Sequence, residues 1–154
     1  MKKIVLLLLS TLTILLAQDK TAKVVYDLTT KDMKTFERKI LKAIVANKAY
    51  YEGHLSELDV VVVIHGDAYK FFTQNPLKTI YKEDKILLEN YKSLAKRIKS
   101  MVENYEVEFL MCGAGMKIRE LKKSDIYKFV TIIPNSTIGL IDKQNEGYAY
   151  IPVN

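Results

Sequence analysis

The one cysteine of the chain, Cys112, is the side chain with the strongest potential for covalent chemistry. It ends a mostly apolar run that begins at Val107, and Gly113 and Gly115 follow it just before a predicted helix over 116–121. Glycines here leave main-chain N–H groups exposed, and a helix N-terminus beside a thiol stabilises the thiolate and lowers its pKa. The pattern indicates either a nucleophilic or persulfide-carrying thiolate or, as for many free cysteines, a small residue buried in the core.

Three polar residues are expected at the same edge of the predicted sheet, because ligands bind beyond the carboxyl ends of parallel strands. His65 follows a valine-rich strand and could polarise the thiol or a substrate, or bond a backbone carbonyl. Asp27 could orient a ligand or cap the adjacent turn, and Asn135 could be a turn residue after Pro134. His54 is placed at the opposite edge, as a surface residue.

The composition argues against several classes of site. One cysteine cannot form an internal disulfide, and with two histidines it leaves no ligand set for a structural zinc ion. The chain has no Gly-x-Ser-x-Gly elbow and no Gly-rich phosphate loop of the Walker type, so no other nucleophile competes with Cys112. We expect no metal and no organic cofactor, because the thiolate alone can hold a sulfur atom. Basic residues between 82 and 99 alternate with acidic ones, which is typical of a solvated helix face and argues against nucleic acid as a partner.

Residues 1–17 have the pattern of a secretory signal peptide. Two lysines precede an uncharged, apolar run from Ile4 to Leu16, and Ala17 is the small residue at its exit. The run is shorter than the roughly 20 residues that span a bilayer. We therefore expect cleavage after Ala17, a formal charge that falls from +6 to +4 with the loss of the two lysines, and a single domain over 18–154 that is periplasmic or secreted. The alternative is an uncleaved N-terminal segment, the one case in which the protein would be attached to a membrane.

The rest of the chain alternates between strand-like and helix-like segments. Apolar runs rich in Val and Ile predict strands at 23–28, 58–64, 107–112, 129–133 and 147–151. Apolar residues at helical spacing predict helices between Asp32 as N-cap and Gly53, over 87–102, over 116–121, and over 137–144 with Ser136 as cap. This alternation implies right-handed βαβ crossovers and one α/β domain with a mostly parallel, five-stranded sheet covered by helices on both faces.

Two groups of aromatic residues are candidates for ligand pockets or protein interfaces. Tyr69, Phe71 and Phe72 follow the second strand, and we expect them to be exposed and to bury themselves against a partner chain or to line a pocket. Tyr148 and Tyr150 alternate along the last strand, so both should lie on one face of it, in the core or at a subunit interface.

Five segments, taken in order, resemble the DsrE/DsrF-like family, which includes the DsrEFH, TusBCD and YchN-like proteins. They are VYDLT at 25–29, VVVIHG at 61–66, EFLMCG at 108–113, VTIIPN at 130–135 and QNEGYAYI at 144–151. The likeness covers residues 23–152. It implies a three-layer α/β/α domain that assembles as homo-oligomeric trimers or hexamers.

The resemblance also implies a role for the cysteine. In some relatives a loop cysteine carries sulfur as a persulfide and hands it to a partner in a sulfur relay. Carried over, Cys112 would be the sulfur-accepting residue, and His65 matches the family's His-Gly strand end. Many relatives have a hydroxyl-bearing residue three places after the cysteine, where this chain has Gly115.

The chain is therefore interpreted as an exported, sulfur-handling protein that accepts a sulfane sulfur on Cys112. No second cysteine can resolve the persulfide, so delivery would be to another protein. Its partners would be a sulfur donor and a sulfur acceptor. The sequence does not decide whether the protein is a carrier alone or an enzyme of the sulfurtransferase type. Two alternatives stay open: a non-catalytic oligomeric module that binds a small ligand or a protein, and a thiol redox sensor that forms a mixed disulfide with a partner.

Overall fold

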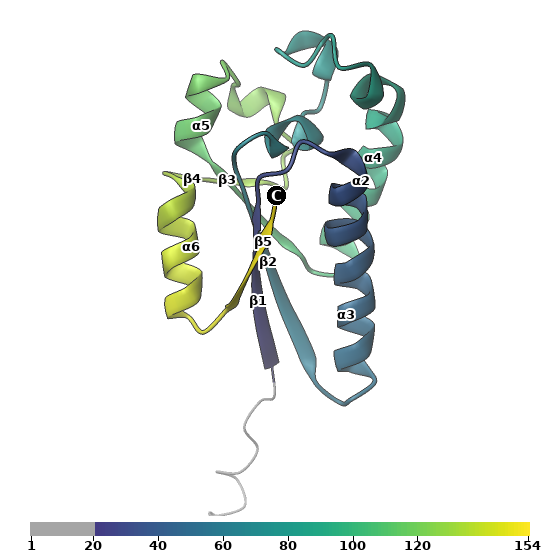
Figure 1. The fold of residues 1–154 in the computed structure, drawn as a ribbon, viewed down its shortest axis with the longest axis vertical. Coiled ribbons are helices and arrows are strands. Elements are labelled where there is room, and N and C mark those ends of the chain that lie inside the picture. The colour runs from purple at the N-terminus through teal and green to yellow at the C-terminus, as the bar shows by residue number, and fades with distance from the viewer. Residues whose placement is uncertain (1–20) are drawn as a thin grey trace, which may run out of the picture.

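One sheet of five parallel strands organises residues 21–154, the part of the chain that the structure, a computed structural model, describes (Figure 1). The strands are β1 (Thr21–Leu28), β2 (Glu57–Ile64), β3 (Glu108–Cys112), β4 (Thr131–Ile133) and β5 (Ala149–Val153). Their order is β4-β3-β2-β1-β5, and each neighbouring pair is parallel. The predicted α/β fold is confirmed, with a sheet that is parallel throughout. The signal peptide predicted at 1–17 lies outside the described residues.

Helices cover both faces of the sheet (Figure 1). They are α2 (Met33–Phe36), α3 (Ala43–Glu52), α4 (Lys85–Glu103), α5 (Gly113–Ile118) and α6 (Ser136–Asn145), and a π-helical stretch, Glu37–Lys42, joins α2 to α3. The α2–α3 stretch and α4 lie on one side of the sheet, and α6 lies on the other, with α5 above it. The three-layer arrangement implied by the resemblance is therefore present. Within residues 21–154, no helix combines the length and apolar character needed to cross a membrane.

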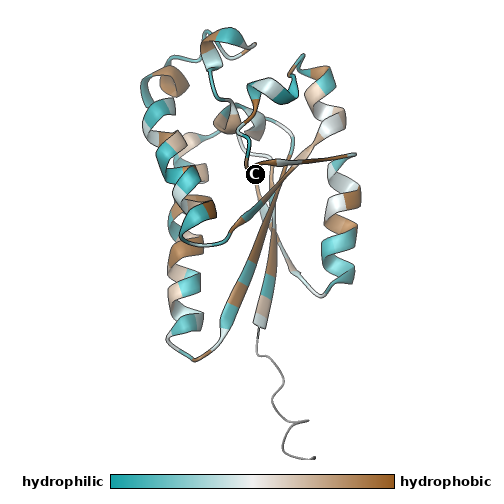
Figure 2. Ribbon diagram, turned by 180° about the vertical axis from the view of Figure 1, so that it is seen from behind, coloured by the Kyte–Doolittle hydropathy of each residue, from teal (hydrophilic) through white to brown (hydrophobic). Residues whose placement is uncertain are grey.

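The sequence of β2 explains why the sheet is covered on both faces. All its residues from Val60 to Ile64 are fully buried, as is typical of a central strand in a parallel sheet. Val60 and Val62 join the larger core on the side of α3 and α4, whereas Val61 and Val63 join a smaller core on the side of α6. Figure 2 shows the result: the strands are apolar along most of their length, and the helices mix apolar and hydrophilic residues.

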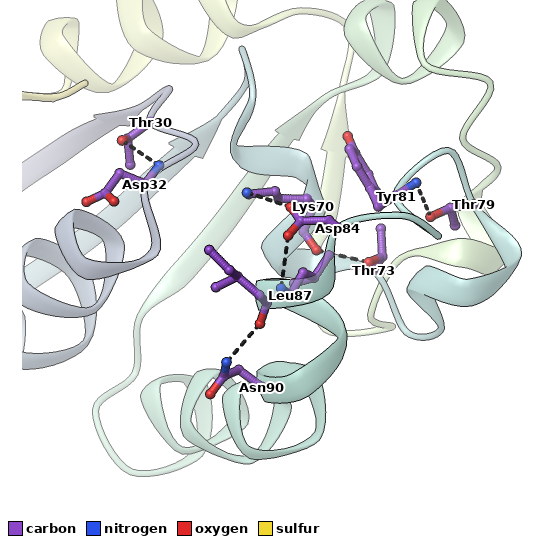
Figure 3. Close-up of polar contacts among 10 residues, drawn as sticks. Thr30, Asp32, Lys70, Thr73, Thr79, Tyr81, Asp84, Leu87 and Asn90 are labelled. Carbon is purple, nitrogen blue, oxygen red and sulfur yellow. Dashed lines mark hydrogen bonds and ion pairs between the residues drawn. The ribbon is translucent and has the colours of Figure 1, made fainter.

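Side-chain caps set the starts of the long helices. The predicted N-cap Asp32 accepts a hydrogen bond from the main-chain N–H of Thr35 (2.7 Å), and the helical stretch ends before Gly53, as predicted. Asp84 caps α4 in the same way, by accepting from the N–H of Leu87 at 3.0 Å (Figure 3).

The same Asp84 ties the segment after β2 to α4. Lys70 Nζ donates to Asp84 Oδ2 at 2.8 Å, and the Thr73 hydroxyl donates to the Lys70 carbonyl oxygen at 2.9 Å (Figure 3). These contacts hold the short 3-10 helix Ala68–Phe72 in place beyond the carboxyl end of β2. Its position matters because it carries Tyr69, which reaches the candidate site.

The aromatic cluster of this 3-10 helix is not exposed, contrary to expectation: Tyr69, Phe71 and Phe72 are buried. Phe71 stacks on Phe36 with ring centroids 4.4 Å apart, and the Phe72 ring lies 5.1 Å from that of Phe109. The prediction was wrong because the segment packs between the first helical stretch and β3, where its rings complete the larger core.

Three predicted boundaries in the second half of the chain also need correction. α5 begins at Gly113, three residues earlier than predicted, because the loop glycines adopt helical geometry despite their low helix propensity. The cap of α6 is Asn135 and not Ser136, since Asn135 Oδ1 accepts from the N–H of Ile138 at 2.9 Å. β5 begins beyond the turn at Gly147, whose φ of +89° is incompatible with a strand.

Candidate functional site

Cys112 lies where two helix N-termini meet the carboxyl edge of the sheet. It is the last residue of β3, and α5 begins at the next residue, Gly113. On the neighbouring strand β4, Ile133 is its register partner, and α6 begins soon afterwards at Ser136. Because β3 and β4 are adjacent and parallel, the first turns of both helices reach the cysteine.

The Cys112 thiol lies beside the first turns of both helices. The donor groups that act on its pKa are the main-chain N–H of Gly115 in α5 and the N–H and hydroxyl of Ser136 in α6, with the Tyr69 hydroxyl, which donates to the Cys112 carbonyl oxygen, beside them. Burial acts to raise the pKa of the thiol, since the residue is only 6% exposed, but the donors outweigh burial and lower the pKa below its ordinary value. The sequence analysis named two glycines whose main-chain N–H groups could face the sulfur, and Gly115 is the one that acts on its pKa.

Tyr69 belongs to this site, although the sequence marked it only as a candidate for a partner interface or a pocket. Its hydroxyl donates to the Cys112 carbonyl oxygen at 2.6 Å, and the Arg119 guanidinium lies 4.9 Å from the centre of its ring. Burial, followed by the neighbouring Cys112, raises the pKa of the Tyr69 hydroxyl far above its usual range, so the group stays protonated and remains a donor. The two residues are 43 positions apart, and only the packing of the 3-10 helix brings them together.

Close packing, rather than an unusual backbone angle, explains the two glycines after Cys112. A Cβ atom at Gly115 would collide with the Tyr69 hydroxyl, and one at Gly113 would lie 3.0 Å from the Ile133 carbonyl oxygen. The Tyr69 hydroxyl thus occupies the space beside position 115, where the resemblance leads one to expect a hydroxyl-bearing side chain.

His65, Asp27 and Tyr150 form a second polar group at the same edge of the sheet. His65 Nε2 lies 2.5 Å from Asp27 Oδ1, and the Tyr150 hydroxyl donates to Asp27 Oδ2 at 2.6 Å. Within residues 21–154, the Asp27 carboxylate thus contacts two side chains and not the adjacent turn, and the His65 ring contacts Asp27 and not a backbone carbonyl. Tyr148 and Tyr150 lie on one face of the sheet, as predicted, since the Tyr148 hydroxyl donates to Asp59 on that face.

The sheet register places His65 beside Cys112, but their side chains contact different groups. Ile64 pairs with Met111, so the two candidates follow at the next position of β2 and β3. Within residues 21–154, no hydrogen bond joins them: the imidazole binds Asp27, and the thiol binds the donors of α5 and α6. The helices, and not His65, stabilise the thiolate in this structure.

The other candidates have structural positions. Asn135 caps α6 and thereby holds Ser136 in its first turn, facing the sulfur. His54 is exposed after α3, with Nδ1 2.7 Å from the Tyr50 carbonyl oxygen, which agrees with the prediction of a surface residue. In the described range, no three His, Cys, Asp or Glu side chains gather into a group that could hold a metal ion.

Comparisons with known proteins agree with this architecture. A model of the DsrE/DsrF-like family matches residues 22–153. An uncharacterized protein of Aquifex aeolicus (strain VF5) is 33% identical over 92 residues, which are 60% of this chain and only 39% of that longer relative. MTH1491 of Methanobacterium thermoautotrophicum, a protein of unknown function, superposes with a TM-score of 0.59 at 17% identity, over 85% of this chain and 98% of its own. At that identity the structural likeness shows the fold alone.

Proposed function

The chain belongs to the DsrE/DsrF-like family, a family of the sulfur-relay type, and we propose that it is a sulfur carrier. Cys112 accepts a sulfane sulfur as a persulfide and passes it to a partner protein. The observation that carries this proposal is the set of donors from Gly115 and Ser136 that lowers the pKa of the Cys112 thiol. The thiolate is the nucleophile in sulfur exchange, so these donors favour the reactive form near neutral pH.

Loading begins when the Cys112 thiolate attacks the outer sulfur of a donor persulfide, R–S–SH. A bond forms between Sγ and that sulfur while the S–S bond of the donor breaks, and the bonding electron pair leaves with the donor as R–S⁻. The proton stays on the transferred sulfur until solvent removes it. The sulfane sulfur changes carrier with no net oxidation, so the step requires no redox cofactor.

Delivery follows the same chemistry in reverse. An acceptor thiolate attacks the outer sulfur of the Cys112 persulfide and releases the Cys112 thiolate. A thiol with a lower pKa is the better leaving group, so the donors of α5 and α6 assist both half-reactions. The chain has no second cysteine, and the sulfur therefore leaves on a different molecule.

The proposal includes export and assembly. Its support for a periplasmic or secreted location is the sequence of residues 1–17, a basic head followed by an apolar run that ends at Ala17. Its support for a homo-oligomer is the family, together with apolar side chains left exposed on α6: Ile138 is 43% exposed and Ile141 is 51% exposed.

Mass spectrometry of the intact mature protein after exposure to inorganic polysulfide tests this function. We expect a gain of about 32 Da, the mass of one sulfur atom, that maps to Cys112 and disappears on reduction. The Cys112→Ser variant is the control and should show no gain. An unmodified wild-type protein, or an equal gain in the variant, contradicts the proposal, and a stable mixed disulfide with a partner would favour the redox sensor instead.

A further inference from the structure

A groove follows the outer edge of β4, next to Cys112. One cavity of about 750 Å³ lies between α5 and β4, and a second of about 400 Å³ lies between β4 and the segment 123–130. Ile132 lines both cavities, so they adjoin at this residue, and we call the two together the β4 groove. Its apolar walls include Ile118, Leu121, Ile126 and Val130.

The β4 groove has three features in common with surfaces that bind extended peptides. β4 is an edge strand, so its outward main-chain N–H and C=O groups have no strand partner among the described residues. Ile118 stands at the rim and is 81% exposed. The groove is also lined by three lysines, Lys117, Lys123 and Lys128. None of the three forms an ion pair within residues 21–154. No Asp or Glu of this range lines either cavity.

We propose that the β4 groove docks an extended segment, both acidic and apolar, of the protein that exchanges sulfur with Cys112. The segment adds as a further strand beside β4. Its main chain bonds the free edge, its apolar side chains enter the two cavities, and its carboxylates face the lysines.

The position of the groove links this docking to the site. Gly113 and Pro134 line the groove; one directly follows Cys112, and the other lies two residues before Ser136. A segment seated there presents its own cysteine beside the thiol. The inference rests on the proposed function for this link, but the docking itself is measured without sulfur transfer.

The charge of the groove favours an acidic segment of a different protein over a second copy of this chain. The other edge strand, β5 (Ala149–Val153), has no acidic residue with which to face the three lysines. The mature chain, without the two N-terminal lysines, carries a formal charge of +4. A basic rim attracts an acidic partner and repels another basic molecule, so complementarity favours a different protein.

Fluorescence anisotropy with a synthetic peptide tests the docking. The probe is a fluorescein-labelled heptapeptide of alternating valine and glutamate, and the protein is the mature Cys112→Ser chain, which forms neither disulfide nor persulfide. We expect saturable binding that weakens with salt and falls about tenfold in Ile118→Glu, which removes an apolar contact and adds a negative charge. Ile86→Glu on α4 is the matched control, because Ile86 is 62% exposed on another surface, and it should bind as the parent does.

Amide hydrogen exchange gives a second readout. The amides of β4 should exchange more slowly with the peptide bound, and those of β5 should not change. Absence of binding by the parent, equal binding by Ile118→Glu, or protection away from β4 overturns the proposal. So does a self-associated parent that Ile118→Glu converts to monomers, because it assigns the groove to a second copy. Persulfide formation without peptide binding refutes only the docking, and peptide binding without persulfide formation refutes only the sulfur carrier.

Discussion

Ser136 presents two donors to the Cys112 sulfur, its main-chain N–H and its hydroxyl. Ser136→Ala removes the hydroxyl and leaves the N–H, so it should raise the pKa of Cys112 toward its ordinary value. The ultraviolet absorbance of the thiolate as a function of pH measures this change. Thr137→Ala, at the exposed neighbouring position on α6, is the control. Identical titrations of Ser136→Ala and the wild type would show that the hydroxyl does not act on the sulfur.

Gly115 and Tyr69 pack so closely that no larger side chain fits at position 115 unless Tyr69 moves. Gly115→Ala forces a methyl group into the Tyr69 hydroxyl and should lower the free energy of unfolding by about 1–3 kcal/mol. In the background of Tyr69→Phe, which lacks the hydroxyl, the same change should cost less. Urea unfolding of the two single variants and the double variant measures this coupling. Strictly additive effects would mean that the two residues are not in contact.

A residue of the site could be predicted from sequence when its partners lie close to it along the chain. Cys112 and the Gly115 amide could be predicted from sequence, because a strand, two glycines and a helix start lie in one short segment. Tyr69 and the hydroxyl of Ser136 could not, since they reach the sulfur only through the packing of β2, β3 and β4. Strand pairing predicted the position of His65, but its ring orientation follows a carboxylate on β1 that no local pattern indicates.

Among the elements, α6 has the most direct connection to the chemistry, and Asn135 determines where it begins. Asn135→Ala removes the acceptor of the Ile138 N–H and should lower the free energy of unfolding by about 1 kcal/mol. It should also raise the pKa of Cys112, because Ser136 is held less firmly at the helix N-terminus. Asn135→Ser keeps a capping oxygen and should restore both properties. If Asn135→Ala loses stability but its thiol titrates as in the wild type, then α6 stabilises the fold and does not lower the pKa of Cys112.

Most elements could be predicted because their side chains repeat with one clear period. The buried run of β2 and the amphipathic stripe of α4 are examples. α5 was placed too late, because two glycines in one turn favour a loop, yet Gly113 and Gly115 both lie in the first turn of the helix. The aromatic residues of the 3-10 helix Ala68–Phe72 were placed after β2, but their burial was missed because it depends on Phe36, which lies far away in the sequence.

For the whole molecule, a lowered thiol pKa is also a source of stability that depends on pH. The folded chain holds the Cys112 proton less tightly than the unfolded chain, so between the two pKa values the unfolded state binds more protons and stability rises with pH. This stability is complete above the unfolded value of about 8.5 and is lost as the pH falls through the folded value.

The advantage of the wild type over Cys112→Ala should therefore grow as the pH rises toward the unfolded value of about 8.5 and then level off. Urea unfolding under reducing conditions at several pH values measures it. The substitution itself leaves a small packing defect, which adds a constant that does not vary with pH. A difference that stays flat, or that shrinks as the pH rises, would contradict a stabilised thiolate.

Alkylation of Cys112 by iodoacetamide, followed as a function of pH, tests the central claim most directly. The rate is measured on the folded protein and on the same protein unfolded in guanidinium chloride, so that one thiol serves as its own reference. The donors of α5 and α6 predict a folded-state midpoint below the unfolded midpoint, which lies near about 8.5. A folded-state midpoint equal to or above the unfolded one would mean that burial outweighs the donors, and the basis for a sulfur carrier would be lost.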